Sequence, residues 1–251
     1  MSEATPTVVL VHGAFADGSS WSGVIERLQA KGLTVTAPAN PLRGISADSA
    51  YVAAVFEQID GPVLAVGHSY GGAVITNAAN DAKNVVGLVY VAAFAPDEGE
   101  TLGAAEAGSK DSVLNSALVP RQYPIAGGTA TEFYIDPAKA REAFAGDLSN
   151  EQAGLIAATQ RPVADAAFGE PNGPPAWKHI KSWAVVATGD KAAGTDVVRS
   201  MAQRAGAKIT EIEGSHVIMI SQPQAVTDVI LEALETVGSG SARLVGSASE
   251  Q

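Results

Sequence analysis

The chain of 251 residues contains no cysteine, and this absence excludes several kinds of chemistry. Disulfide bonds, thiolate nucleophiles, iron–sulfur clusters and cysteine-bound zinc all require that residue. Charged residues are also scarce, at 17% of the chain, against about 25% in an average soluble protein. A nucleophilic mechanism in this chain must therefore use oxygen rather than sulfur.

Positive charge is the scarcer sign, with 16 Lys and Arg against 27 Asp and Glu, a formal net charge of −11. That balance argues against a nucleic-acid partner, because phosphate binding needs a basic patch. It also argues against docking on an anionic membrane. Residues 1–6 lack the basic and apolar regions of a signal peptide. The longest apolar run, near Val85–Ala95, is shorter than the roughly 20 residues of a membrane span. We therefore expect a cytoplasmic, globular protein.

Short apolar runs alternate with helical patterns along most of the chain, which predicts a mostly parallel sheet with helices on both faces. The run at 85–92 is almost continuously apolar, as expected for a strand buried on both sides. The predicted strands are 7–12, 33–37, 62–67, 85–92, 183–188 and 208–212. The predicted helices are 22–30, 48–59, 73–83, 196–205 and 224–237.

Residues 98–182 interrupt this alternation. They contain helical pieces and the punctuators Gly127-Gly128 and Gly173-Pro174-Pro175, and we predict no strand among them. The segment is interpreted as a helical cap inserted between two strands of the sheet. The core is then formed by 1–97 and 183–237, in one domain. Residues 238–251 are small and polar, which predicts a flexible tail.

The motif with the clearest chemical meaning is Gly67–Gly72, with the sequence Gly-His-Ser-Tyr-Gly-Gly. It lies between a predicted strand and a predicted helix, the context in which G-x-S-x-G forms a nucleophile elbow. Its glycines let strand and helix approach closely, so that the Ser69 oxygen stands above the carboxyl edge of the sheet near a helix N-terminus. A dinucleotide fingerprint would need glycine at position 69, and a P-loop would need lysine at position 73, where the chain has Ala73.

A nucleophilic serine needs a base, and the chain has four histidines. His216 follows the predicted strand 208–212 and therefore lies at the same sheet edge as Ser69. His68 belongs to the elbow, and we expect its side chain to point away from Ser69. His12 is interpreted as a loop-orienting residue, and His179 as a cap residue. We therefore predict that His216 is the base.

The histidine in turn needs a carboxylate that fixes its tautomer. Asp190 follows the strand 183–188 through Gly189 and is the first candidate. Asp97 follows the strand 85–92 and is the second, because some serine hydrolases take their acid from that earlier strand. Asp196 fits the first turn of the next helix better than a catalytic position.

An oxyanion hole needs two converging N–H groups. We assign one to Tyr70, directly after the nucleophile, and the other to Ala14 in the loop 11–15, where Gly13 allows a close approach. The histidines lack metal-binding spacing, so we expect neither a metal nor a cofactor. Arg43 is interpreted as a solvated loop residue. The aromatic candidates for substrate binding are Phe15, Phe94, Phe133, Phe168 and Trp177.

These segments together resemble the α/β-hydrolase superfamily, and within it the plant methylesterase and hydroxynitrile lyase group and its bacterial esterase relatives. The resemblance is carried by 9–14, 67–69, 91–97, 190–191 and 214–216. The order serine, aspartate, histidine is that of the superfamily. The resemblance implies an eight-stranded fold, of which we expect about six parallel strands here. The lyases carry threonine where this chain has Gly13 and lysine where it has Val217, which favours ester hydrolysis over cyanohydrin cleavage.

The sequence therefore predicts a serine hydrolase that cleaves a small carboxylic ester through an acyl-enzyme. The same triad can open lactones, cleave C–C bonds or carry out perhydrolysis, and these reactions remain alternatives. A non-catalytic ligand-binding protein on the same scaffold is a further alternative, against which the complete set of serine, histidine and aspartate argues. The expected partner is a small ester-like molecule, without nucleic acid or membrane. A homodimer is compatible with the sequence, which shows no interface.

Overall fold

The computed structural model describes residues 5–246, with side chains described as far as Gly238. A six-stranded parallel sheet of order β2-β1-β3-β4-β8-β9 forms its centre. Each of the six predicted strands is present. They are β1 (Thr7–Val11), β2 (Val35–Thr36), β3 (Val63–His68), β4 (Val85–Val91), β8 (Ser182–Ala187) and β9 (Lys208–Ile212).

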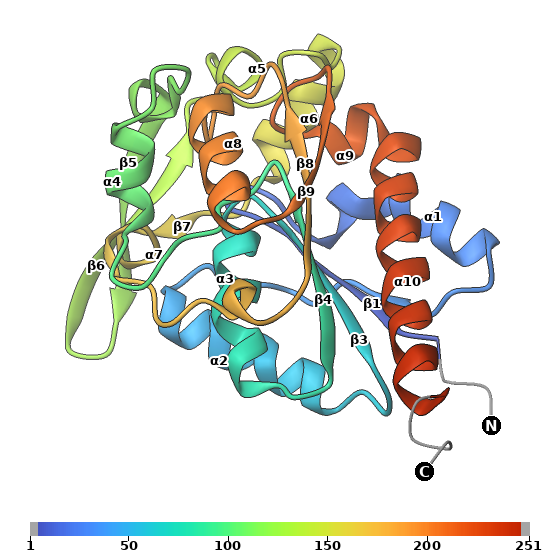
Figure 1. The fold of residues 1–251 in the computed structure, drawn as a ribbon. Helices are drawn as coiled ribbons and strands as arrows, with labels where there is room; N and C mark the ends of the chain where they lie inside the picture. Colours follow the sequence, from blue (N-terminus) through green and yellow to red (C-terminus); the bar gives the residue numbers. More distant parts are fainter. Residues whose placement is uncertain (1–4, 247–251) are drawn as a thin grey trace.

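Helices cover both faces of this sheet, as Figure 1 shows. One face carries α1 and α10, and the other carries α2, α3 and α8. Both β3 and β8 are buried along their whole length, which agrees with their largely apolar sequences. The helices of the core are η1 (Gly18–Trp21), α1 (Ser22–Ala30), α2 (Ile45–Glu57), α3 (Tyr70–Asp81), α8 (Thr195–Arg204), α9 (Ile218–Ser221) and α10 (Pro223–Gly246).

The order of the strands in the sheet indicates where a ligand crevice is expected. The chain runs from β1 outward to β2, and then returns to β3 on the other side of β1. In open parallel sheets, ligands bind outside the carboxyl ends of the strands at such a switch point. The loops that follow β1 and β3 meet there, and these are the loops that contain Gly13 and Ser69.

The cap between β4 and β8 differs from the prediction, because it contains a three-stranded antiparallel sheet of order β5-β6-β7. The interpretation of this segment as a purely helical cap is therefore wrong. Its elements are α4 (Leu102–Ala107), η2 (Leu114–Ala117), β5 (Leu118–Ile125), β6 (Gly128–Ile135), α5 (Ala140–Ala143), α6 (Asn150–Thr159), β7 (Val163–Ala164), α7 (Asp165–Gly169) and η3 (Ala176–Lys178).

The missed hairpin has a signal in the sequence. Ile125 pairs with Gly128, so the turn has two residues, and the second, Gly127, has a φ of 83°. Two-residue hairpin turns favour glycine because they need positive φ. Pro120 and Pro124 argue against a strand, but β5 is an edge strand of the small sheet, where a missing N–H is tolerated.

The last helix also differs from the prediction. We expected it to end at Val237 and a flexible tail to follow, but α10 continues to Gly246. Adding a residue to a helix that has already formed costs much less than starting one, so a polar, glycine-containing extension can continue the helix. The remaining residues of the expected tail, 247–251, lie outside the described part of the chain.

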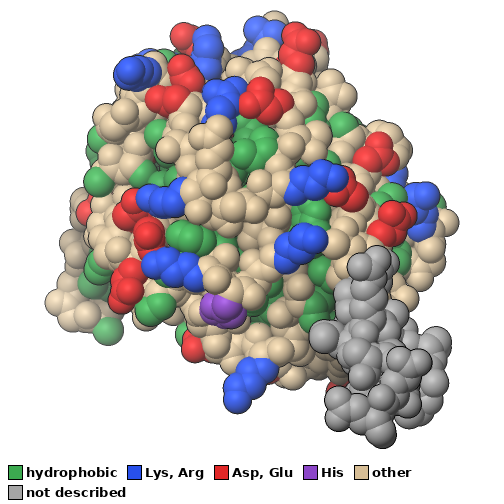
Figure 2. Space-filling view, viewed as in Figure 1, with side chains coloured by type: hydrophobic (Ala, Val, Ile, Leu, Met, Phe, Trp, Pro, Cys, Tyr) green, Lys and Arg blue, Asp and Glu red, His purple; other side chains and the backbone are tan. Residues whose placement is uncertain are grey.

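The surface mixes both signs of charge. Figure 2 shows basic side chains beside acidic ones over the face it displays. Partly exposed ion pairs of the structure include Arg204 with Glu100 and Arg199 with Glu211, at 2.6 and 2.7 Å. No helix within residues 5–246 has the length and apolar character needed to span a membrane.

Candidate active site

Ser69 lies between the end of β3 and the start of α3 with a φ of 53° and a ψ of −122°. Residues with a Cβ rarely adopt this conformation, and they keep it only where the surroundings impose it. A Cβ on Gly67 would lie 2.5 Å from the Gly71 carbonyl oxygen, so only glycine allows strand and helix to approach this closely. The strained elbow predicted from the motif is therefore present in the backbone.

Hydrogen bonds hold the elbow in place from both sides. The Ser69 N–H donates to the Val91 carbonyl oxygen at 3.3 Å, and the Ser69 carbonyl oxygen accepts from the N–H groups of Gly72 at 3.0 Å and Phe94 at 3.2 Å. Val91 and Phe94 belong to the end of β4 and the loop after it. These bonds stabilise the strained backbone and fix the position of the serine side chain, which is buried.

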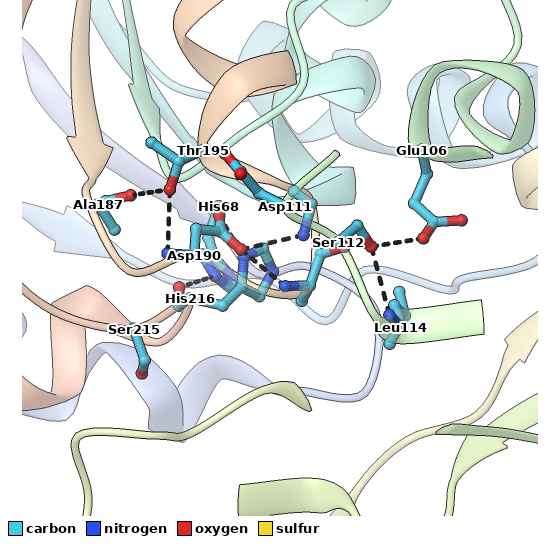
Figure 3. A network of polar contacts seen from close by, with 12 residues as sticks. His68, Glu106, Asp111, Ser112, Leu114, Ala187, Asp190, Thr195, Ser215 and His216 are labelled. Carbon is cyan, nitrogen blue, oxygen red and sulfur yellow. Dashed lines mark hydrogen bonds and ion pairs between the residues drawn. The ribbon is translucent and has the colours of Figure 1, made fainter. Parts of the chain in front are cut away.

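His216 and Asp190 form a buried pair, shown in Figure 3. Their Nδ1 and Oδ2 atoms are 2.8 Å apart, and both side chains are 1% exposed. The second carboxylate oxygen, Oδ1, accepts from the N–H groups of Ala192 and Ala193 at 2.9 and 3.0 Å. With Nδ1 donating to Asp190, the Nε2 atom of a neutral His216 is free to accept a proton.

Hydrogen bonds also fix the loop between β8 and α8, which contains Asp190. The Thr195 hydroxyl accepts from the Asp190 N–H at 3.1 Å and donates to the Ala187 carbonyl oxygen at 2.8 Å. Both contacts appear in Figure 3. The backbone of Asp190 is thus held against the end of β8 and the start of α8, and its carboxylate is held by Ala192, Ala193 and His216.

The other two carboxylates considered as the acid lie elsewhere. Asp97 is paired with Lys178 at 2.7 Å, and 34% of its side chain is exposed. Asp196 accepts hydrogen bonds from the Ser109 hydroxyl and the Lys110 N–H. Of the three candidates, Asp190 is the one that the fold brings to His216.

His68 has a larger part in the site than the sequence indicated. Its Nε2 donates to the His216 carbonyl oxygen at 3.0 Å, and the two ring centroids are 4.7 Å apart. Burial lowers the pKa of His68 well below its usual value, and the nearby His216 ring lowers it further. His68 directly precedes the nucleophile. In its neutral form it therefore connects the elbow to the backbone of the histidine loop, the loop after β9 that contains Ser215 and His216.

His12 orients the loop after β1, as predicted. Its Nδ1 donates to the Gly13 carbonyl oxygen at 2.9 Å, and its Nε2 accepts from the Asn40 N–H at 3.0 Å. Burial lowers the pKa of His12, and its Nε2 must stay unprotonated to accept this bond. A Cβ on Gly13 would lie 2.7 Å from the Ser69 Cβ, so the loop packs directly on the serine.

The two residues assigned to the oxyanion hole flank this contact. Ala14 follows Gly13, and Tyr70 is the first residue of α3, where backbone N–H groups have no partner within the helix. The Tyr70 hydroxyl donates to the buried Asp48 at 2.7 Å, which fixes the start of the helix. Their role as oxyanion donors stays a prediction.

The aromatic candidates divide into two groups. Phe15 is buried, and its ring stands edge-on to that of Phe144 at 6.0 Å. Phe94 is buried and contacts Ser69 through its N–H group. Phe133 and Phe168 pair within the cap at 6.5 Å. Substrate contact by these four side chains stays a prediction.

Trp177 belongs to the joint between cap and core. Its Nε1 donates to the Pro96 carbonyl oxygen at 3.0 Å, and the charged ends of Lys178 and Arg204 lie 5.5 and 5.9 Å from its ring centroid. These contacts favour a structural role, and its predicted contact with substrate is untested. Arg43 also joins core and cap, since it pairs with Glu132 of β6 at 2.6 Å, while 41% of its side chain stays exposed, as expected of a solvated loop residue.

Sequence reasoning missed two cap residues beside the histidine. The Phe144 ring lies 5.1 Å from the His216 ring. Asp147 accepts hydrogen bonds from the N–H group and the hydroxyl of Ser215. No motif surrounds either residue, because each reaches the site through packing of the cap on the core.

Comparison with known proteins is consistent with this arrangement. A model described as the alpha/beta hydrolase family matches residues 8–229. The structure of polyneuridine aldehyde esterase is similar, with a TM-score of 0.77 and 22% identity over 91% of this chain and 99% of the other. A pyrethroid hydrolase from Sphingobium faniae JZ-2 has a TM-score of 0.76 and 22% identity, over 92% and 98%. A variant of tomato methylketone synthase I has a TM-score of 0.73 and 20% identity, over 93% and 99%. Comparison with curated protein sequences finds no match.

Proposed function

The chain belongs to the alpha/beta hydrolase family, and we propose that it hydrolyses small carboxylic esters with Ser69 as nucleophile, His216 as base and Asp190 as the orienting acid. The observation that carries this proposal is the buried His216–Asp190 pair at 2.8 Å, in a loop that His68 connects to the serine elbow. Ester hydrolysis is also the activity named for one structural neighbour, polyneuridine aldehyde esterase.

The proposed reaction begins when the Ser69 oxygen attacks the ester carbonyl carbon. His216 Nε2 takes the serine proton, and the carbonyl oxygen becomes an oxyanion held by the N–H groups of Ala14 and Tyr70. Collapse of this intermediate breaks the bond to the alcohol oxygen, which receives the proton from His216. A water molecule then attacks the acyl-serine, gives its proton to His216, and the acid leaves as Ser69 regains a proton.

Asp190 acts through His216 in this scheme. Its Oδ2 holds the Nδ1 proton, so that Nε2 faces the serine as an acceptor, and its charge stabilises the imidazolium that forms after proton transfer. The two N–H groups of Ala192 and Ala193 stabilise the carboxylate. The acid therefore stays in position through both halves of the reaction.

The test is labelling and substitution of Ser69. We expect a fluorophosphonate to label Ser69 and the S69A variant to lose at least about 10⁴-fold in kcat on a short acyl ester. The matched control is S49A, which removes a buried hydroxyl that donates to the Val74 carbonyl oxygen in the helical layer. Labelling of a different residue, or an S69A variant as active as the parent, would contradict the proposal.

The alternatives from the sequence require a wider substrate panel. Lactones, β-diketones and a perhydrolysis assay test the other reactions of the same triad, and ester hydrolysis is expected to exceed them in kcat/KM. A ligand-binding protein without activity would show neither labelling nor turnover. The predicted cytoplasmic location and small-molecule partner are tested by cell fractionation and by this panel.

A further inference from the structure

A pocket of about 210 Å³ lies against the loops that carry the proposed catalytic groups. Phe15 directly follows Ala14, Val217 directly follows His216, and both line the pocket. The cap contributes Phe144 and the apolar residues of and before α6, including Leu148 and Ile156. The pocket is thus formed jointly by core and cap, and it is lined by neighbours of the proposed catalytic groups rather than by those groups themselves.

The polar side chains of this pocket already have partners within their own segments. Ser19 donates to the Asp17 carboxylate, the Thr159 hydroxyl donates to the Leu155 carbonyl oxygen, and the Gln152 side chain accepts from the Ser149 N–H in a capping box. They are occupied in capping and stabilising helix ends. A ligand would therefore be recognised through apolar contact, and an anionic group would meet the charge of Asp17.

The position of the pocket relative to His216 indicates which part of a substrate it takes. In the proposed reaction, His216 delivers a proton to the alcohol oxygen, so that oxygen must lie within hydrogen-bonding distance of its ring. The Phe144 ring is 5.1 Å from the His216 ring, and Phe15 stands edge-on to Phe144. The group attached to the alcohol oxygen is then the part of the substrate nearest to this aromatic pair.

We propose that this pocket binds the alcohol half of the ester, and that the group it takes is neutral, apolar and about the size of one aromatic ring. The inference rests on the proposed ester hydrolysis. A dry apolar cavity of about 150 Å³ is large enough for benzene, so this pocket admits a single ring or a branched alkyl group. Edge-on aromatic walls are favourable for such a ring.

The test varies the alcohol while the acyl group stays constant. The ratio of kcat/KM for benzyl acetate to that for methyl acetate measures the contribution of the pocket. We expect this ratio to exceed about 10 in the parent, since one or two apolar groups commonly contribute that much. The I156W variant fills the pocket and is expected to lower the ratio at least about tenfold. The I156A variant enlarges the pocket. It is expected to raise the ratio of kcat/KM for naphthylmethyl acetate to that for methyl acetate.

The matched control is I125W, at an exposed position of the β5–β6 hairpin, and it is expected to keep the parent ratio within about twofold. A second series, methyl benzoate against methyl acetate, varies the acyl group. If I156W changes this second ratio and not the first, the assignment to the alcohol half is wrong.

The remaining outcomes separate this inference from the proposed function. A parent that hydrolyses neither acetate contradicts ester hydrolysis itself. A parent that is active, with an alcohol ratio that neither I156W nor I156A changes, contradicts only the pocket assignment. If I156W fails to fold, as judged by thermal unfolding, the result with I156A decides.

Discussion

The carboxyl edge of the sheet and the cap above it contribute to the site in different ways. Ser69, Asp190 and His216 all lie in loops that follow parallel strands of the core. Backbone bonds hold Ser69 and Asp190, and the His68 side chain holds the His216 carbonyl oxygen. The cap approaches these loops from outside, with Ser112 donating to the Ala192 carbonyl oxygen at 2.7 Å and Asp147 accepting from Ser215. The core thus positions the reacting groups, while the cap braces their loops and shapes the space around them.

The largest expected difference between the two regions is between their histidines. H216Q removes the proposed base in the core and should lower kcat by about 10⁶-fold, comparable to the loss of a nucleophile or base in a serine protease. H179Q changes an exposed histidine of the cap and should leave kcat within about twofold. Steady-state kinetics with a short ester provides the comparison, and equal losses in both variants would contradict the proposed base.

The carboxylates provide the second comparison. D190N keeps the shape of the acid but favours the wrong histidine tautomer, and we expect kcat to fall by about 10⁴-fold. D97N is the control, because Asp97 follows a core strand but bonds Lys178 of the cap. A larger loss in D97N than in D190N would reverse the assignment of the acid.

The third prediction concerns the stability of the core below neutral pH. Burial lowers the pKa values of His12 and His68 in the folded protein, whereas both titrate near pH 6.5 when unfolded. Above that pH both states bind equal numbers of these protons. Below it the unfolded chain binds more, so the free energy of unfolding should fall by up to about 1.4 kcal/mol per pH unit for each histidine. Denaturant unfolding from pH 7.5 to 5.0 measures this slope, and a flat profile between pH 6.5 and 5.0 would contradict it.

The smallest expected effect is that of removing the contact between Asp147 of the cap and Ser215 of the histidine loop. Burial alone would raise the pKa of Asp147, but hydrogen bonds from Ser215, Ser221 and the backbone together outweigh it and the pKa is lowered, so the carboxylate is charged at neutral pH. D147A leaves the Ser215 N–H group without its acceptor, and we expect a roughly tenfold loss in kcat with little change in KM, because the histidine loop loosens. The exposed neighbour Glu142 provides the control variant E142A. A change in KM alone would indicate a role in binding rather than in positioning.

The extent of sequence-based prediction follows the same division between core and cap. The elbow was predictable because six consecutive residues carry its whole requirement: glycines for close approach and a serine at positive φ. The position of His216 was predictable because carboxyl ends of parallel strands share one edge. The hairpin of the cap also had a local signal, Gly127 in a two-residue turn, but its prolines concealed it.

The sequence by itself determined the alternation of strands and helices, the strained elbow and the order of serine, aspartate and histidine, since these depend on local backbone preferences and apolar patterning. Only the tertiary structure decided that Asp190 and not Asp97 meets His216, and that Phe144 and Asp147 reach the histidine loop. Asp97 and Asp190 both follow buried strands, but Asp97 is paired with a lysine 81 residues away, whereas Asp190 is paired with His216. Such contacts arise from how the cap packs on the core, and no short segment of sequence contains them.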